Sequence, residues 1–391
     1  MSKPLVLVVF GTRPEAIKLA PVIRALACSG DVRVEVCVTA QHREMLDSML
    51  ESFDIVPDHD LDLMQAGQDL NGFTSRALPR LQATLKAVAP DYVLVQGDTT
   101  TAFVTALAAF YEGIPVGHVE AGLRSFDLAN PFPEEANRAL ISRLADLHFA
   151  PTPTAAANLR AEGIPSARIL TTGNTVVDAL MIDGAKTRAF RDPLLRESLA
   201  RLREGDTAVV VTTHRRENHG EPLLTLCAAF TALVERHEGL HLFYPVHMNP
   251  KVRAVVTERL RHPRAHLLPA LDYFDLMGLL RRSSFVLTDS GGLQEEAPAL
   301  GKPVVVLREV TERPEAVEAG VAVLAGTATD SVVREATRLL VDARHYAAMS
   351  RGSGVYGDGR ASERIVAAIR HKFGISRLRA EQFLPVMGAS K

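Results

Sequence analysis

The chain has 391 residues, of which 47% are hydrophobic, and its 44 basic residues nearly balance its 46 acidic residues. This length allows two domains, each with a hydrophobic core of its own. The balanced charge argues against a broad surface for nucleic acid or membrane, although it leaves room for a local basic pocket.

The three cysteines, Cys28, Cys37 and Cys227, are odd in number and widely spaced. They suggest neither a disulfide framework nor a metal site and are typical of a reducing cytoplasm. No stretch is long and apolar enough to span a bilayer, and the apolar run at 5–10 is too short for a signal peptide. We therefore expect a cytoplasmic protein without a membrane partner.

Short β-branched runs alternate with helical patterns along the chain. The first series of expected strands is 5–10, 32–39, 92–96, 116–120, 147–150 and 169–172. The second series is 208–213, 242–246, 266–268, 285–288, 304–307 and 321–324. Such alternation predicts an α/β fold of parallel sheets covered by helices on both faces. Two series predict two doubly wound domains.

We place the first domain at 1–173 and the second at 174–373. The boundary is expected between Gly173 and Gly205, where 186–203 has the composition of a polar helix bridging the domains. The tail, about 374–391, is a candidate to pack back onto the first domain. Open α/β sheets bind ligands beyond the carboxyl ends of their strands, so the cleft between two such domains is the predicted active site.

The turn after the first expected strand begins a helix and contains Arg13. A guanidinium there can clamp a phosphate or carboxylate through two hydrogen bonds. Lys18 follows one helical turn later, where an exposed lysine on the helix surface is the simpler explanation.

Three acids, Asp98, Glu120 and Glu134, leave consecutive strand ends of the first domain, so we expect them to converge. Two of them have structural alternatives: Asp98 as a helix cap, and Glu134 as the partner of Arg138 at i, i+4. For Glu120, which is followed by two small residues, a purely structural role is harder to find.

In the second domain, His214, Arg215 and Arg216 follow a strand, and Arg313 follows another. Clustered carboxylates next to a histidine provide separate acid and base roles. We therefore expect His214 to face the acids of the first domain.

Ser290, Gly291 and Gly292 follow a strand and begin a short helix. With Ser290 as the N-cap, the free N–H groups of the first turn can bind an anion, and the glycines permit its close approach. A plain strand-to-helix turn remains the alternative. Glu296 lies further along the same helix. It either meets ribose hydroxyls or, like Glu295, is a solvated surface acid.

The sequence contains no G-x-x-x-x-G-K-[ST] phosphate-binding loop and no G-x-G-x-x-G dinucleotide-binding fingerprint. It also lacks the G-x-S-x-G nucleophile elbow of a hydrolase. His237 and His241 are spaced i, i+4, but Gly239 between them is expected to end the helix. His214 and His219 lack the H-E-x-x-H pattern. We therefore expect no zinc site.

Taken together, the motifs resemble the non-hydrolysing UDP-N-acetylglucosamine 2-epimerases, a bacterial and archaeal family. The similar stretches, in chain order, are GTRPEAIK, TAQHREMLD, QGDTTT, HVEAGLRS, PFPEEANR, THRREN, YPVHMNP, TDSGGLQEEAPALGKPV and TERPEA. The resemblance implies a GT-B architecture of two Rossmann-like domains. It also implies interconversion of UDP-GlcNAc and UDP-ManNAc without NAD, metal or another cofactor, and a homodimer by analogy.

Matching positions imply three sets of residues. The catalytic set is Asp98, Glu120, Glu134 and His214. The UDP-sugar ligands are Arg13, Lys18, Arg138, Ser290, Gly291, Gly292, Glu296 and Arg313. A second, activating UDP-GlcNAc is implied at Gln41, Arg76, Arg215 and His247. The implied reaction eliminates UDP to give 2-acetamidoglucal and adds UDP back after a proton arrives on the other face of C2.

The sequence departs from the family pattern at Phe126, where relatives often have Gly, and at Leu276, where they often have Phe. Three other functions remain open. An epimerase for another UDP-sugar would tend to have GARPQ in the first turn. A retaining GT-B glycosyltransferase would have a second Glu at Pro303 or Val304. A nucleotide-sugar sensor would not need the acids together with His214.

Overall fold

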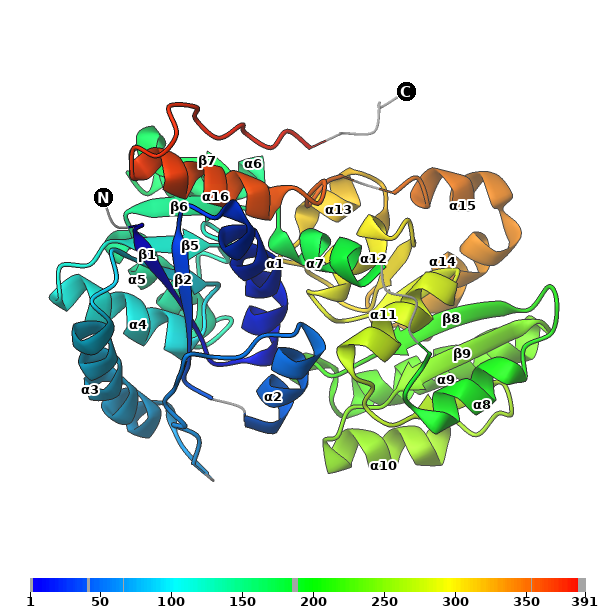
Figure 1. Ribbon diagram of the computed structural model, residues 1–391. Coiled ribbons are helices and arrows are strands. Elements are labelled where there is room, and N and C mark those ends of the chain that lie inside the picture. Colours follow the sequence, from blue (N-terminus) through cyan, green and yellow to red (C-terminus); the bar gives the residue numbers. More distant parts are fainter. Residues whose placement is uncertain (1–2, 41–42, 66, 185–188, 353, 386–391) are drawn as a thin grey trace. The chain divides into compact units, whose positions relative to one another are not determined.

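The computed structural model describes residues 3–40, 43–65, 67–184, 189–352 and 354–385. The chain forms two compact units. Within the described residues, the first unit runs up to Ile182 and includes Tyr356–Pro385, and the second is Asp183–Val355. Figure 1 shows the elements of both units.

The first unit has a parallel sheet of order β3-β2-β1-β4-β5-β6-β7. Its strands are β1 (Leu5–Phe10), β2 (Arg33–Val38), β3 (His59–Asp60), β4 (Tyr92–Gln96), β5 (Val116–Val119), β6 (Leu147–Ala150) and β7 (Ile169–Thr171). Its helices are α1 (Arg13–Ser29), α2 (Arg43–Ser52), α3 (Leu70–Val88), α4 (Thr100–Tyr111), α5 (Glu134–Leu144), α6 (Pro153–Ala161), α7 (Thr175–Gly184) and α16 (Ala361–Lys372), with a 3-10 turn at Ser166–Arg168.

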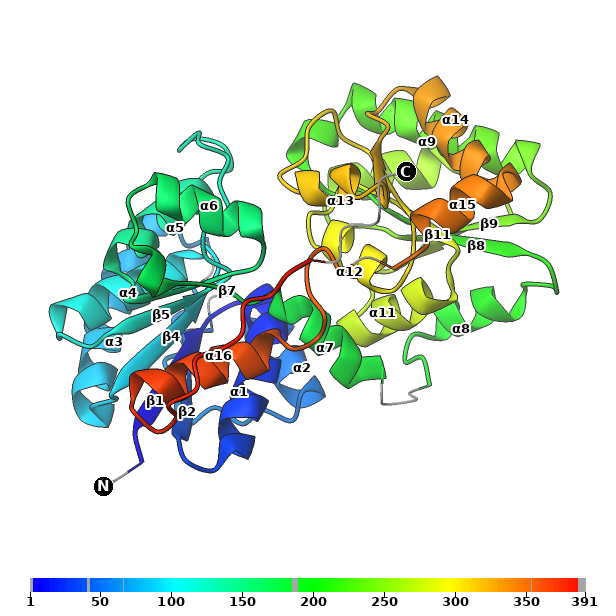
Figure 2. The ribbon, with the colours of Figure 1, turned by 90° about the horizontal axis from the view of Figure 1, so that it is seen from above.

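Helices cover both faces of this sheet (Figure 2). α3, α4 and α5 pack side by side on one face, and α1 with α16 lies on the other. The central strand β1 is buried along its whole length, which is why its sequence is a continuous apolar run. The core on the α3–α5 face includes Leu7, Val9, Phe73 and Val93.

The second unit has a parallel sheet of order β10-β9-β8-β11-β12-β13. Its strands are β8 (Thr207–Thr212), β9 (Leu240–Pro245), β10 (Ala265–Leu268), β11 (Phe285–Thr288), β12 (Val304–Val306) and β13 (Ala322–Leu324). Its helices are α8 (Pro193–Ala200), α9 (Glu221–Arg236), α10 (Pro250–Arg259), α11 (Tyr273–Arg282), α12 (Leu293–Ala299), α13 (Pro314–Glu318), α14 (Thr329–Val341) and α15 (Ala343–Met349), with a 3-10 turn at Arg216–Asn218. α9 packs against α14 on one face of the sheet, and α8 and α11 lie on the other (Figure 2).

The α/β prediction is confirmed, since both sheets are parallel and carry helices on both faces. The division of the chain differs from the predicted one. α16 belongs to the first unit, where it packs on α1 and Arg370 pairs with Asp31 at 2.6 Å. The expected bridging helix is also different, because the described part of 186–203 contains α8, which contacts β10 of the second unit.

The tail after α16 runs along the edge of the first sheet. The amide N–H of Phe383 donates to the carbonyl of Thr171 at 2.7 Å, and Gln382 accepts from the amide of Thr171 at 2.8 Å. The Phe383 ring is buried. These contacts extend the first unit to Pro385. Among the described residues, no helix is long and apolar enough to cross a membrane.

Gly122, just after β5, has φ of +91°, and a Cβ there would lie 2.2 Å from the carbonyl oxygen of Ala155. Replacing Gly122 with Ala should therefore lower the melting temperature by about 5 °C or more, because strain and overlap each cost ~1–3 kcal/mol. Gly163→Ala is the matched control, since Gly163 has φ of +85° but nothing within 4 Å of its Cβ position. Equal losses in the two variants, measured by calorimetry, would contradict the close approach at Gly122.

Candidate functional site

The turn between β1 and α1 is built around a buried carboxylate. Glu15 is fully buried and accepts from the amides of Gly11 (3.1 Å) and Thr12 (2.8 Å) and from the Thr12 hydroxyl (2.7 Å). Its other oxygen accepts from the Thr99 hydroxyl at 2.7 Å. Glu15 therefore ties the turn at Gly11 and Thr12, just before Arg13, to the turn that carries Asp98.

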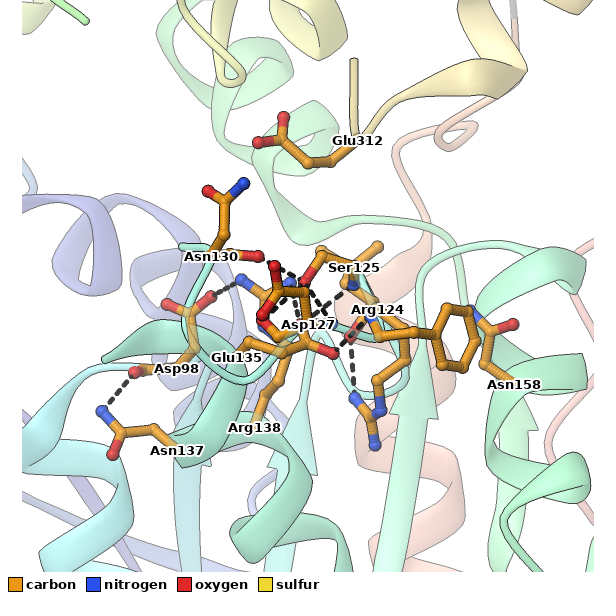
Figure 3. Close-up of polar contacts among 12 residues, drawn as sticks. Asp98, Arg124, Ser125, Asp127, Asn130, Glu135, Asn137, Arg138, Asn158 and Glu312 are labelled. Atoms are coloured by element: carbon orange, nitrogen blue, oxygen red, sulfur yellow. Dashed lines mark hydrogen bonds and ion pairs between the residues drawn. The ribbon is translucent and has the colours of Figure 1, made fainter. Parts of the chain in front are cut away.

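Asp98 does not cap the following helix. The N-cap of α4 is Thr99, whose hydroxyl accepts from the amide of Ala102. The Asp98 carboxylate instead pairs with Arg138 at 2.6 Å, and its backbone carbonyl accepts from the Asn137 side chain at 2.9 Å (Figure 3). The capping explanation is wrong, and two side chains of α5 fix Asp98 in place.

The expected i, i+4 pair of Glu134 with Arg138 is not found among the described residues. Arg138 is 7% exposed and pairs with Asp98 and, at 3.3 Å, with Glu135. The Oε2 atom of Glu134 is buried without a hydrogen-bond partner in the described part of the chain. A buried carboxylate oxygen of this kind is able to accept from a bound ligand, which keeps Glu134 a candidate functional residue.

Glu120 has a left-handed backbone with φ of +63°. Backbone of this kind in a residue other than glycine is costly and is found mostly at functional sites. The Glu120 carboxylate forms an ion pair with the ammonium of Lys18 and accepts from the Asn174 side chain at 3.1 Å. Lys18 is therefore not the exposed helix lysine that its position alone suggested.

The loop after β5 is held by two residues that the sequence argument did not select. Glu135 accepts from the amide of Ser125 at 3.0 Å (Figure 3). It also accepts from the amide of Phe126 at 3.0 Å. The side chain of Arg124 is buried and pairs with Glu162, with N–O contacts of 2.5 and 2.9 Å. The Phe126 side chain is 72% exposed, so this loop presents an aromatic ring at the position where relatives were expected to have glycine.

In the second unit, His214 is anchored by a carboxylate. Asp289 is fully buried, and its Oδ1 lies 3.0 Å from Nδ1 of His214. It also accepts from the amides of His214 (2.9 Å) and Arg215 (3.0 Å) and from the Asn218 side chain (2.9 Å). Burial would raise the pKa of Asp289, but the hydrogen bonds from His214 and these amides outweigh it, so the pKa lies below its ordinary value.

The glycine turn of the second unit lies next to two guanidinium groups. From a Cβ built at Gly291, the Nη2 atoms of Arg215 and Arg313 are 3.4 and 3.8 Å away. Arg313 is oriented by an ion pair with Glu295, which is 2% exposed. Two cations that meet at a turn without side-chain bulk form a suitable site for a phosphate group.

The structure corrects one detail of this turn. Ser290 does not cap α12, whose N-cap is Gly292, and no side-chain cap is found in the described residues. The reason is that Gly292 already has helical φ and ψ of −63° and −46°. Glu296 is 8% exposed, which excludes the solvated surface acid considered for it.

The residues assigned to an activating ligand fall in different places. Gln41 lies outside the described residues. Arg76 is in α3 of the first unit, where it donates to Gln68 at 2.8 Å. His247 stacks on His214 with ring centroids 6.0 Å apart, so it and Arg215 adjoin predicted substrate and catalytic residues of the second unit.

Within the described residues, no group of three or more His, Cys, Asp or Glu side chains could hold a metal ion.

Comparison with known proteins decides the family. The family model of UDP-N-acetylglucosamine 2-epimerase matches residues 24–370. UDP-N-acetylglucosamine 2-epimerase from Escherichia coli (strain K12) is 49% identical over 94% of this chain and 98% of its own length. The chain belongs to the UDP-N-acetylglucosamine 2-epimerase family. It is therefore an isomerase, as the resemblance implied.

Two solved structures are closely similar to this epimerase. The UDP-GlcNAc 2-epimerase from Neisseria meningitidis, bound to UDP-GlcNAc, has a TM-score of 0.87 and 43% identity and covers 94% of this chain and 100% of its own. The S. aureus MnaA–UDP structure has a TM-score of 0.88 and 44% identity and covers 97% and 100%. These matches confirm the predicted GT-B-like fold.

Besides Arg124, three acids of this epimerase escaped the sequence argument: Glu15, Glu135 and Asp289. All three lie inside the motifs and are buried acids that accept from backbone amides of strand-end turns. For two of them the sequence contained a signal, an acid directly next to a selected residue: Glu135 follows Glu134, and Asp289 precedes Ser290.

Burial raises the pKa of Glu15 to about 7, although its four donors act to lower it. Its contribution to stability is therefore present at low pH and is lost as the pH rises through about 7. Relative to wild type, Glu15→Gln should gain stability between pH 5 and pH 8, by up to about 3 kcal/mol, because Gln has no charge to bury. Thermal unfolding of both proteins across this range tests it. A stability difference between the two proteins that does not change with pH would mean that the four donors fully offset the effect of burial on the pKa of Glu15.

Proposed function

We propose that this epimerase interconverts UDP-N-acetylglucosamine and UDP-N-acetylmannosamine by elimination and re-addition of UDP. A base removes the proton from C2, that C–H electron pair forms the C1=C2 double bond, and the C1–O bond breaks with its electrons going to UDP. In the return step, C2 takes a proton on its other face and the UDP oxygen bonds to C1. The atoms balance without an oxidant, reductant or metal.

The main support is the pair of guanidinium groups at Gly291. A departing UDP gains negative charge on its diphosphate, and stabilising that charge as it develops is the largest need of the reaction. Arg215 and Arg313 meet where the backbone leaves room for a phosphate. The Ser290 hydroxyl, which caps no helix, is suited to donate to the same group, and the buried Glu296 to accept from the ribose.

The acids of the first unit are suited to the proton transfers and to the cationic character that develops at C1. Asp98 and Glu120 are each already paired with a cation, Arg138 and Lys18 respectively. Within the part of the chain that the structure describes, Glu134 keeps a buried oxygen without a donor, which suits it to accept a proton. We propose that these acids and His214 form the catalytic set, with Arg13 as a further ligand of the substrate.

In D₂O, the protein should convert UDP-GlcNAc to UDP-ManNAc with deuterium at C2, which proton NMR follows directly. Glu134→Gln should lower both epimerisation and exchange by about 10²–10⁴-fold, because one positioned proton-transfer group is removed. Affinity for UDP, measured by calorimetry, should change less than about threefold. Epimerisation without deuterium incorporation would exclude the elimination route, and transfer to an acceptor would indicate a glycosyltransferase.

Arg215→Met should weaken UDP binding by about tenfold or more, because a guanidinium beside the diphosphate is lost. Arg253→Met, which removes the same charge from the exposed face of α10, is the matched control and should bind UDP like wild type. If Arg215→Met binds UDP normally but loses activation by added UDP-GlcNAc, Arg215 serves an activating ligand instead, as the family resemblance implied.

A further inference from the structure

His214 has one ring nitrogen committed to the protein. Its Nδ1 lies 3.0 Å from Oδ1 of Asp289, and the Asp289 side chain has no exposed surface. The pKa of Asp289 lies below its ordinary value, so the group is an ionised carboxylate that can only accept. Nδ1 must therefore carry a proton and donate it to Asp289.

The rest of the environment fixes the plane of the imidazole. The amides of His214 and Arg215 donate to the same carboxylate, and the Asn218 side chain donates to its Oδ2. The His247 ring stacks on the His214 ring at an interplanar angle of 25°. The side chain of His214 is 38% exposed, so the anchored ring still reaches the surface.

We infer that Asp289 is a positioning residue that holds the proton of His214 on Nδ1 and so leaves Nε2 as the atom that exchanges a proton with the substrate. This inference rests on the proposed function, in which His214 belongs to the catalytic set. Neutral His214 then accepts a proton only at Nε2, and protonated His214 donates only from Nε2. The neighbouring backbone bonds make Asp289 rigid, so the ring cannot rotate to offer the other nitrogen without losing a buried hydrogen bond.

The buried carboxylate also links His214 to the diphosphate turn. Asp289 is directly followed by Ser290 and Gly291, and its carboxylate holds the amide of Arg215, whose guanidinium lies at Gly291. One residue thus sets the position of a proton-transfer group and of the leaving-group site.

The test uses Asp289→Asn in the full-length protein. An amide at this position turns an N–H₂ group toward Nδ1 in order to keep its oxygen on the backbone donors, and the ring must then carry its proton on Nε2. We expect kcat for epimerisation to fall by about 10²–10⁴-fold, as is found when a comparable carboxylate behind a histidine is replaced in other enzymes. KM and UDP affinity should change much less.

Asp178→Asn is the matched control for lost stability. Asp178 is also a buried acid that accepts from two successive amides, those of Ala361 and Ser362, and none of its hydrogen-bond partners among the described residues is a histidine. This variant should lose thermal stability comparably and keep kcat. Equal loss of kcat in both variants, after correction for folded fraction, would overturn the positioning role.

A spectroscopic readout makes the inference independent of turnover. In ¹⁵N-histidine protein, long-range proton–nitrogen NMR distinguishes the two neutral tautomers, and His214→Gln identifies the relevant signal among the 13 histidines. Wild type should show the Nδ1–H tautomer and Asp289→Asn should not. An Nε2–H tautomer in wild type overturns the inference even if the enzyme epimerises. Lack of epimerisation with the Nδ1–H tautomer present defeats the proposed function alone.

Discussion

The site depends on carboxylates buried against the backbone amides of strand-end turns. A loop after a parallel strand leaves successive N–H groups without strand partners, and burying them unpaired costs about 1–3 kcal/mol each. Glu15, Glu135 and Asp289 each accept from two such amides. Because one carboxylate offers two oxygens, a single side chain holds a whole turn. The turns held in this way contain Arg13, Phe126 and His214.

Much of the fold is predictable because a continuous apolar run between turn residues is typical of a buried parallel strand. Twelve of the described strands overlap the strands predicted from the sequence, whereas β3 is two residues long and is defined by its pairing with β2. The place of α16 could not be predicted either. It depends on contacts such as that of Arg370 with Asp31, 339 positions away, which no local pattern encodes.

The site is less predictable than the fold, because two acids that are adjacent in the same helix can have different surroundings. Glu134 and Glu135 differ by one position, yet Glu135 is 2% exposed and bound to two amides, whereas Glu134 keeps a buried oxygen without a partner in the described structure. Motif resemblance selects the stretch but not the orientation. The orientation follows from Arg138, which reaches Asp98 of another strand end rather than the acid four positions before it.

The ion pairs also suit the proposed reaction, in which the leaving group must return. A cation that binds eliminated UDP too strongly would stabilise the eliminated state and slow re-addition. Only interactions that are stronger in the transition state than in the bound states speed the chemical step. Arg313 is paired with the buried Glu295, so part of its charge is already neutralised. Asp98 and Glu120 are likewise balanced by Arg138 and Lys18. Half-neutralised pairs can stabilise charge as it appears on the substrate and release it as it disappears, which the proposed elimination and re-addition requires.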